Sequence, residues 1–419
     1  MKKTLLSAAA FATVAVSAVA IAPTTSEAIP AFARQTGAAC LSCHFQTFPA
    51  LNSFGRAFKQ GSFTDVGDQA LVEDDNLSIP AVMNATIVIR GNIQKTTGSK
   101  AVYNIPLETP ILVAGRVGTN SGFFVEFANG GTGGPVSVGN WQFLNSFDMG
   151  DLKVGLGAHN SAFGGSAVLE TSNVFGQHSG KLGGVNLSAI NTVGFTAPSL
   201  AIAGWVGNET FDVQAGLIAP SAAQGAPIGG SLGQIIRAHY FMDVAGFDTM
   251  IGAGIVAGNA KTYGTTVLTQ NTTASVSAMD LKFVDFQMQG DLNDDMSLGI
   301  YGDFATTADK SVVAPVAGGV ATTNFYGGAG KYTGFSLRAE LKPVHNMGFG
   351  VGFSQSTATP TVVAPAVAVA TKTNTFQVAA FYEVYQNFEL NLIYNSAKAK
   401  TGILSKTTTT TTLEFEALL

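Results

Sequence analysis

The segment Phe388-Glu389-Leu390-Asn391-Leu392-Ile393-Tyr394-Asn395 places an apolar side chain at every second position. The intervening register is mainly polar, with Glu389, Asn391 and Asn395. A period of two is that of a β-strand, in which successive side chains point to opposite faces. This segment therefore predicts a strand with one apolar face and one largely polar face.

The same alternation recurs from about Ile79 to the C-terminus, most clearly in 211–217, 335–341, 376–384 and 413–417. Segments of about ten residues with this pattern are typical of outer-membrane β-barrels, whose apolar face meets lipid while the other face lines the lumen. A soluble β-sandwich shows the same alternation but carries more surface charge. Charged residues make up 12% of this chain, about half the usual ~25%, which favours the barrel.

The connections between these segments alternate between short and long. Short turns are expected at 148–151, 243–247, 290–295, 342–346 and 385–387, and longer Gly-, Thr- and Ala-rich loops at 92–108, 160–196, 220–232, 259–274, 306–327 and 358–373. Periplasmic turns and extracellular loops alternate in this way. We therefore predict a mainly β fold, an antiparallel barrel of about sixteen strands with both termini on the periplasmic side. A strand at 184–196 would make the count odd, so that segment is assigned to a long loop folded over or into the barrel.

The N-terminus predicts export. Met1-Lys2-Lys3 is followed by a mainly apolar run to Pro23 and a small-x-small site ending at Ala28. This is the pattern of a signal peptide, residues 1–28, and the apolar run is short and Ala-rich for a retained transmembrane anchor. The barrel then implies an outer-membrane location in contact with the lipid bilayer. The net charge of −5 argues against nucleic acid as a partner.

The only two cysteines lie in Cys40-Leu41-Ser42-Cys43-His44. A Cys-x-x-Cys-His run is the attachment pattern of a c-type haem, in which the two thiols form thioethers and the histidine ligates the iron. A structural disulfide, a redox Cys-x-x-Cys and a zinc half-site are the alternatives. No βαβ pattern surrounds the motif, and no second ligand pair lies nearby. The sequence therefore predicts one covalently bound haem c, with Cys40 and Cys43 as attachment residues and His44 as axial iron ligand.

The motif belongs to an N-terminal unit, residues 29–80, that precedes a barrel domain of residues 81–419. A short helix is expected from Pro49 to just before Gly61, with an apolar face made of Leu51, Phe54 and Phe58. A unit of this size has little core of its own, and a barrel of sixteen strands has a lumen wide enough to need filling. We therefore expect this mostly α-helical or irregular unit to plug the lumen.

Three basic residues of the unit, Arg34, Arg56 and Lys59, suit either of two roles: they offset the haem propionates, or they form a solvated surface. The second axial ligand is open as well, and a methionine there raises the haem potential relative to a histidine. The main candidates are Met83 and His239, and the others are Met149, Met242, Met288, His159 and His178.

Several carboxylates are expected on the lumenal face: Glu126, Asp212, Asp303, Glu340, Glu383, Glu389 and Glu414. They are candidates for holding a cation in the lumen. The simpler interpretation is that they balance arginines of the same face, namely Arg90, Arg116, Arg237 and Arg338.

The sequence on either side of the haem motif resembles a known family. Ala31-Phe32-Ala33-Arg34-Gln35-Thr36-Gly37 precedes the motif, and Phe48-Pro49-Ala50-Leu51-Asn52-Ser53-Phe54-Gly55-Arg56-Ala57-Phe58-Lys59 follows it. Together they look like the N-terminus of the fused outer-membrane cytochrome–porins, some of which oxidise Fe(II). The remainder of the chain is similar only in its strand pattern. The last residue, Leu419, departs from the Phe common at the end of outer-membrane proteins.

The resemblance implies a function. A single c-type haem held by Cys40, Cys43 and His44 would oxidise extracellular Fe(II) and pass electrons to a soluble periplasmic cytochrome. The chain would then be an Fe(II)-oxidising oxidoreductase, or simply an electron carrier. Two alternatives remain: a haem-plugged porin for small-solute transport, and an outward conduit to extracellular acceptors. The direction of electron flow and the choice between monomer and trimer stay open.

Overall fold

A computed structural model gives the structure of the chain, and the description covers residues 30–46, 50–75, 77–128, 136–159, 189–192, 199–220, 228–229, 232–262, 275–308, 322–324, 330–360 and 369–419. The predicted signal peptide lies outside these residues. None of the helices in the described ranges is long and apolar enough to cross a membrane.

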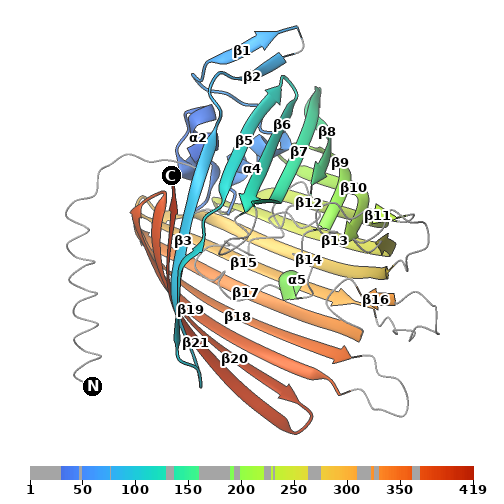
Figure 1. Ribbon diagram of the computed structural model, residues 1–419, viewed down its shortest axis with the longest axis vertical. Coiled ribbons are helices and arrows are strands. Elements are labelled where there is room, and N and C mark those ends of the chain that lie inside the picture. The colour runs from blue at the N-terminus through green and yellow to red at the C-terminus, as the bar shows by residue number, and fades with distance from the viewer. Residues whose placement is uncertain are drawn as a thin grey trace.

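Within the described ranges, sixteen antiparallel strands close into a barrel (Figure 1). They are β3 (Ala85–Thr96), β4 (Ala101–Glu108) continued by β5 (Ile111–Gly118), β6 (Ser121–Ala128), β7 (Ser137–Met149), β8 (Leu152–His159), β9 (Ser199–Gly207), β10 (Phe211–Pro220), β12 (Gly233–Val244), β13 (Phe247–Thr262), β14 (Ser275–Asn293), β15 (Met296–Thr307), β17 (Gly330–Val344), β18 (Met347–Pro360), β19 (Thr371–Tyr385), β20 (Phe388–Thr401) and β21 (Leu404–Leu418). Two short segments, β11 (Ile228–Gly229) and β16 (Thr322–Asn324), pair at its margin. The last strand pairs with the first, from Thr410↔Thr96 to Leu418↔Val88, and this closes the barrel.

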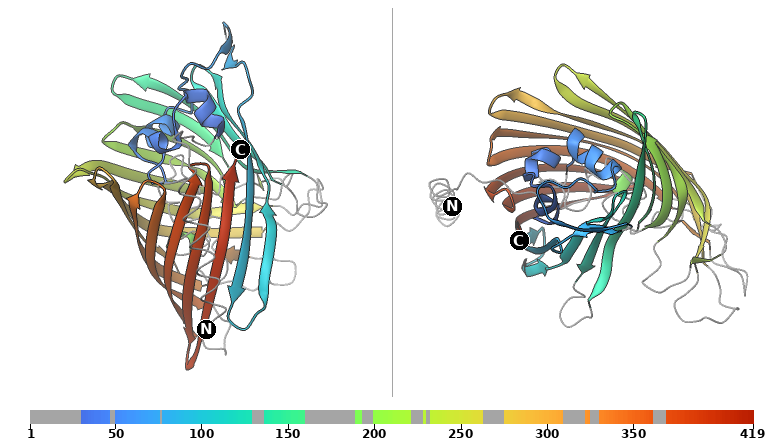
Figure 2. Two further views of the ribbon diagram at one scale, coloured as in Figure 1. Left: turned by 90° about the vertical axis from the view of Figure 1, so that its left-hand side faces the viewer. Right: turned by 90° about the horizontal axis from the view of Figure 1, so that it is seen from above.

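The N-terminal unit lies inside one end of this barrel. Its helices are α2 (Pro30–Thr36), α3 (Cys40–Cys43) and α4 (Ser53–Gln60), followed by the hairpin β1 (Leu71–Asp74) and β2 (Leu77–Pro80). Seen from above, the blue helices are enclosed by the ring of strands (Figure 2). The C-terminus lies at the same end. The predicted plug is therefore present in the described part of the unit.

The strands have the two-faced character expected of a membrane barrel. On β19, Phe376 and Val378 are 45% and 38% exposed on the outer face, whereas Gln377 on the inner face is fully buried. The same pattern runs through the neighbouring strands, where exposed Leu, Val, Ile and Phe side chains cover the outside. Because such an apolar surface is stable in lipid but not in water, the outer wall is a lipid-facing surface.

Aromatic side chains on the inner wall lie over glycines of adjacent strands. A Cβ at Gly155 would come within 2.0 Å of the Trp205 ring, and one at Gly348 within 2.0 Å of the Phe381 ring. Both rings are buried, at 3% and 2% exposure. An aromatic ring that covers a strand glycine protects the exposed backbone and fixes the local strand register.

The predicted turns at 148–151, 243–247, 290–295, 342–346 and 385–387 all join adjacent strands at one end of the barrel. The prediction of a long loop at 92–108 is wrong. Residues 85–108 form β3 and β4, joined by a turn at 97–100. Threonine, serine and lysine made this hairpin look like a loop, but it pairs with β21 and continues the wall.

The helix after the haem motif begins later than expected. Position 49 lies outside the described residues, and α4 starts at Ser53 because the Asn52 side chain caps it, accepting a 2.9 Å hydrogen bond from the Gly55 amide. It ends at Gln60, just before the C-cap Gly61, as predicted. Of the apolar face predicted for this helix, Phe58 is buried, but Phe54 is 48% exposed.

Candidate functional site

The Cys-x-x-Cys-His motif forms one helical turn. Cys40 and Cys43 begin and end α3, so their side chains are three positions apart and share one helix face. Both are thiols without a disulfide between them, and both are buried, at 6% and 7% exposure. His44 leaves the helix in extended conformation, with φ −112° and ψ 147°, and is 7% exposed. Two adjacent thiols and a neighbouring imidazole are the donor set that covalent haem attachment requires.

Helix α4 packs directly on the motif. The Asn52 amide nitrogen donates to the Cys43 carbonyl at 3.0 Å, and the backbone of His44 pairs with Leu51. A Cβ at Gly55 would lie 2.1 Å from the Cys43 carbonyl oxygen, so only glycine fits at this contact. The motif and α4 are therefore one rigid piece.

Burial also changes the chemistry of the Cys43 thiol. Desolvation, with a smaller contribution from the negative charge of Asp65, raises the pKa of Cys43 to about 11. A thiol with so high a pKa is almost fully protonated near neutral pH and is a poor nucleophile. In the docked unit the thiol is therefore unsuited to reaction.

An ion pair fastens α4 to the barrel wall. Arg56 Nη2 lies 2.6 Å from Asp248 Oδ2 at the start of β13, and the guanidinium group lies 5.0 Å from the centroid of the Phe241 ring. The Arg56 side chain is 6% exposed and that of Asp248 30%. Arg56 thus has a docking role. Lys59 is 2% exposed, so the prediction that it forms part of a solvated surface is wrong.

A second fastening holds the loop that follows the motif. Lys342 on β17 donates to the Gln46 carbonyl at 2.9 Å and forms an ion pair with Glu383 at 2.7 Å. The Gln46 side chain donates to the Ser297 carbonyl at 2.9 Å. Lys342 and Glu383 are each 5% exposed, so this pair is shielded from solvent.

Helix α2 is held on the opposite side of the lumen. The Ala31 amide donates to Thr86 Oγ1 at 2.9 Å, and Gln35 accepts from the Arg116 amide at 2.9 Å. Arg34 donates to the Ala85 carbonyl at 2.6 Å and so contacts the wall. Phe32, Phe58 and Phe63 form an aromatic cluster between α2 and α4, with ring centroids 4.8–5.6 Å apart.

Several of the predicted lumenal charges pair with one another on the inner face. Arg90 contacts Glu414 at 2.9 Å and Glu108 at 3.1 Å, and Arg338 Nε lies 3.6 Å from Glu340. Arg237 pairs with Asp285 at 2.7 Å. The simpler interpretation, that carboxylates balance arginines, therefore accounts for Glu340 and Glu414.

Arg237 and Asp285 meet across a strand that separates them. They lie on β12 and β14, and their partners on the intervening β13 are Gly254 and Gly252. A Cβ at Gly252 would lie 2.4 Å from the Asp285 carboxylate. The ion pair can therefore form only because the two inward positions of β13 carry no side chain.

The two main distal-ligand candidates occupy different surroundings. Met83 lies between β2 and β3 and is 70% exposed, whereas His239 on β12 is 3% exposed. His239 Nδ1 lies 3.4 Å from Asp212 Oδ1, and its ring stacks 6.1 Å from that of Phe241. Which residue would face His44 across the iron of the predicted haem stays a prediction. The described residues contain no cluster of three or more His, Cys, Asp or Glu side chains suited to a free metal ion.

Part of the segment predicted to fold into the barrel does so. Residues 189–192 form the short helix α5, and the amides of Ala189 and Ile190 donate to the Asp303 carboxylate on β15 at 3.0 and 2.8 Å. Ser336 on β17 donates to the same carboxylate. Ala189 and Ile190 are 2% and 1% exposed, so α5 packs against the inner wall.

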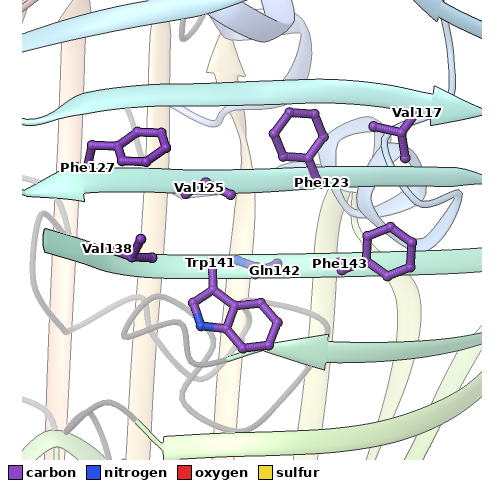
Figure 3. Close-up of a pocket in the computed structure, with 8 residues that line it drawn as sticks. All are labelled: Val117, Phe123, Val125, Phe127, Val138, Trp141, Gln142 and Phe143. Carbon is purple, nitrogen blue, oxygen red and sulfur yellow. The ribbon is translucent and has the colours of Figure 1, made fainter. Parts of the chain in front are cut away.

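The outer wall carries an apolar hollow of about 550 Å³ (Figure 3). Its lining comes from β5, β6 and β7: Val117, Phe123, Val125, Phe127, Val138, Trp141, Gln142 and Phe143. It opens on the lipid-facing side, away from the haem motif, where a membrane acyl chain would fill it. The hollow is therefore separate from the candidate site at the plug.

Sequence reasoning did not find Asp248, Lys342 or the role of Asp303. The period-two pattern shows which face a charged side chain occupies, but not which distant residue it meets. Gln46 and Lys342, for example, are joined only once the barrel is closed. The inward carboxylates were a usable signal, and Asp303 was among them.

No protein-family model matches the chain, and no curated protein matches it. Solved structures match in fold. The in-vitro folded OmpT of Vibrio cholerae in its trimer form aligns with a TM-score of 0.50 and 9% identity, over 81% of this chain and 99% of that one. The outer-membrane channel DcaP of Acinetobacter baumannii aligns at 0.49 and 12%, over 80% and 97%, and OprD of Pseudomonas aeruginosa at 0.42 and 10%, over 84% and 96%. The chain therefore has the fold of porin-like outer-membrane barrels.

Proposed function

We propose that this protein is an outer-membrane electron conduit that oxidises extracellular Fe(II) at one c-type haem and passes the electron to a soluble periplasmic carrier. The observation that carries the proposal is a Cys-x-x-Cys-His turn held inside one end of a porin-like barrel. The similarity of residues 31–59 to the fused cytochrome–porins supports the same conclusion. In the proposed arrangement, the barrel lies in the outer membrane with its short turns and both termini facing the periplasm.

Cys40 and Cys43 would hold the haem by thioether bonds, and His44 would ligate its iron. When bound, this group supplies a one-electron centre whose potential depends on its axial ligands and on burial. The other residues position it: Gly55 allows α4 to contact the motif, and Arg56 and Lys342 fix the unit in the lumen. A single centre within the thickness of the membrane would then accept the electron from the extracellular side and donate it to the periplasmic carrier.

The burial of both thiols has a consequence for biogenesis. Because Cys40 and Cys43 are 6% and 7% exposed in the docked unit, we propose that haem attachment precedes docking of the unit in the lumen. An exported, still unfolded segment presents both thiols to solvent.

An optical spectrum with a potential titration tests the proposal. The protein purified from a host able to attach c-type haem is expected to show a c-type spectrum and to be reduced by excess Fe(II) at the working pH. Haem that stays oxidised under these conditions would exclude Fe(II) oxidation. Reduction instead by periplasmic donors, with a potential below that of the iron couple, would point to outward electron flow.

A second candidate is a porin for small solutes, with the haem unit as a structural plug. The fold shared with OmpT and other outer-membrane barrels favours this reading. Conductance in planar bilayers separates the two. The electron conduit predicts small currents in the intact chain, because α2–α4 fill one end of the lumen, whereas large open currents would favour the solute channel.

A further inference from the structure

One part of the N-terminal unit has no role in filling the lumen. The hairpin β1–β2 forms a separate two-stranded sheet and stands beyond the end of the barrel (Figure 1). Its base is tied to the wall by reciprocal amide hydrogen bonds between Gln69 and Asn84, at 2.7 and 3.0 Å. Asn84 is 2% exposed, and its carbonyl accepts from Ala114 on β5. The hairpin is thus held in place at its base and solvated at its tip.

The hairpin and the segment that follows it expose apolar side chains. Val72 and Leu77 are 48% and 39% exposed, and Val82 and Met83 are 71% and 70% exposed. Most other exposed apolar residues in the described ranges belong to the lipid-facing wall, but the hairpin projects past that wall. Two-stranded sheets are marginally stable alone in water, and grouped exposed apolar side chains mark interaction sites.

The same region is strongly acidic. Between Lys59 and Arg90 the chain contains no lysine or arginine. It contains five acidic residues, all exposed: Asp65, Asp68, Glu73, Asp74 and Asp75. None of the five forms an ion pair within the described ranges; the Glu73 carboxylate accepts only from Ser78, at 3.0 Å. These charges are therefore available to an external partner.

We propose that the β1–β2 hairpin, with Val82 and Met83 beside it, is the docking surface for a soluble protein whose contact face has lysines around an apolar centre. Complementary charge steers encounter and fixes orientation, while the apolar side chains supply the contact. Small surfaces of this kind suit short-lived redox encounters. That the partner is the electron acceptor rests on the proposed function, whereas the surface itself does not.

The location agrees with that role. The hairpin follows α4 directly in the chain and lies at the same end of the barrel as the haem motif (Figure 2). A carrier bound there would be next to the single redox centre without entering the lumen. The lipid bilayer is a poor occupant, because anionic headgroups would be repelled by the five carboxylates.

Binding of a defined probe to the full-length chain in detergent tests the proposal. The probe is a lysine-rich mitochondrial-type cytochrome c, and the same protein with its lysines acetylated is the control ligand. Thermophoresis gives Kd at low and high salt. We expect binding of the unmodified probe, a loss of about tenfold or more on acetylation, and weakening by salt, since exposed charges are screened within a Debye length of about 10 Å at 0.1 M.

Matched variants locate the surface. Glu73→Lys/Asp74→Lys/Asp75→Lys reverses three charges of the hairpin, and Asp291→Lys/Asp294→Lys/Asp295→Lys makes the same change at the exposed β14–β15 turn of the same barrel end. The hairpin variant is expected to raise Kd at least about tenfold and the turn variant less than about threefold, as for local charge complementarity. An equal increase of Kd in both variants would show an effect of net charge alone and would overturn the proposal. An unchanged Kd in the hairpin variant would overturn it as well.

The apolar contribution has its own variant. Val72→Ser/Met83→Ser should weaken binding while leaving the salt dependence unchanged, because no charge is altered; unchanged binding would overturn the apolar part of the surface. Thermophoresis does not need a redox-active haem. A chain that lacks a c-type spectrum but binds the probe through the hairpin would contradict the proposed electron transfer and would still support the docking surface.

Discussion

At the scale of single residues, Gly55 is the position where the haem motif depends on the absence of a side chain. In Gly55→Ala the added Cβ would lie 2.1 Å from the Cys43 carbonyl, and relieving such an overlap costs about 1–3 kcal/mol. We expect the N-terminal unit to become susceptible to limited proteolysis while the barrel stays intact. Gly118→Ala is the control, because its nearest neighbour would be 3.8 Å away. Equal protease resistance in both variants would contradict this packing.

The Arg56–Asp248 ion pair makes a second prediction. Asp248→Asn removes the partner charge of a guanidinium group that is 6% exposed. Leaving a largely buried charge uncompensated costs several kcal/mol in a dry interior, and the partial exposure of Asp248 reduces this to about 1–3 kcal/mol.

Hydrogen exchange of the α4 amides measures the effect on docking. Faster exchange in Asp248→Asn, by roughly tenfold or more, corresponds to that range through local opening. Asp243→Asn, in the neighbouring turn, is the control, since the exposed Asp243 accepts only from the Gly246 amide and asparagine can do the same. Exchange that is equally fast in both variants would show that the pair does not hold the plug.

At the scale of elements, α5 depends on one carboxylate. Asp303 accepts from the amides of Ala189 and Ile190 and from Ser336, and hydrogen bonds to a charged group contribute about 1.5–3 kcal/mol each. Asp303→Asn loses the charge and one acceptor, so the two amides should exchange at least about tenfold faster. Glu389→Gln, which alters another lumenal carboxylate, should leave them unchanged. Protection that survives in Asp303→Asn would show that burial alone holds α5.

The elements themselves were largely predictable. Alternation in 376–384 and 388–395 identifies strands because one face meets lipid and the other does not. The prediction failed at 92–108 because Thr96, Thr97 and Ser99 near the turn resemble a loop, although Tyr103, Ile105 and Leu107 form an exposed apolar face on β4. The start of α4 was missed because Pro49 suggested a first helical turn, whereas Asn52 provides the cap.

The contacts of the candidate site were less predictable. Cys40, Cys43 and His44 are adjacent in the chain, so their proximity followed from the motif. Arg56 with Asp248, and Gln46 with Lys342, are far apart in the sequence and meet only through closure of the barrel. No periodicity encodes such a pairing, and the distal ligand of the proposed haem could not be predicted for the same reason.

At the scale of the whole molecule, we expect the barrel to fold without an intact haem motif. The barrel closes through strand pairing that does not involve Cys43 or His44. Cys43→Ser and His44→Ala should therefore give barrels with unchanged heat-modifiable mobility in detergent gels, but without reduction by Fe(II). Loss of the folded barrel in both variants would show instead that haem attachment is required for assembly.

The closure of the barrel also fixes a sequence of events in time. The final residues of the chain pair with the first strand, and the Leu419 amide donates to the Ile87 carbonyl at 2.8 Å. The compartment that encloses the motif is therefore complete only after β21 has been synthesised and exported. In the proposed function, haem would have to be attached before that pairing. A motif that had not received haem by then would be enclosed by the barrel and inaccessible to an attaching enzyme.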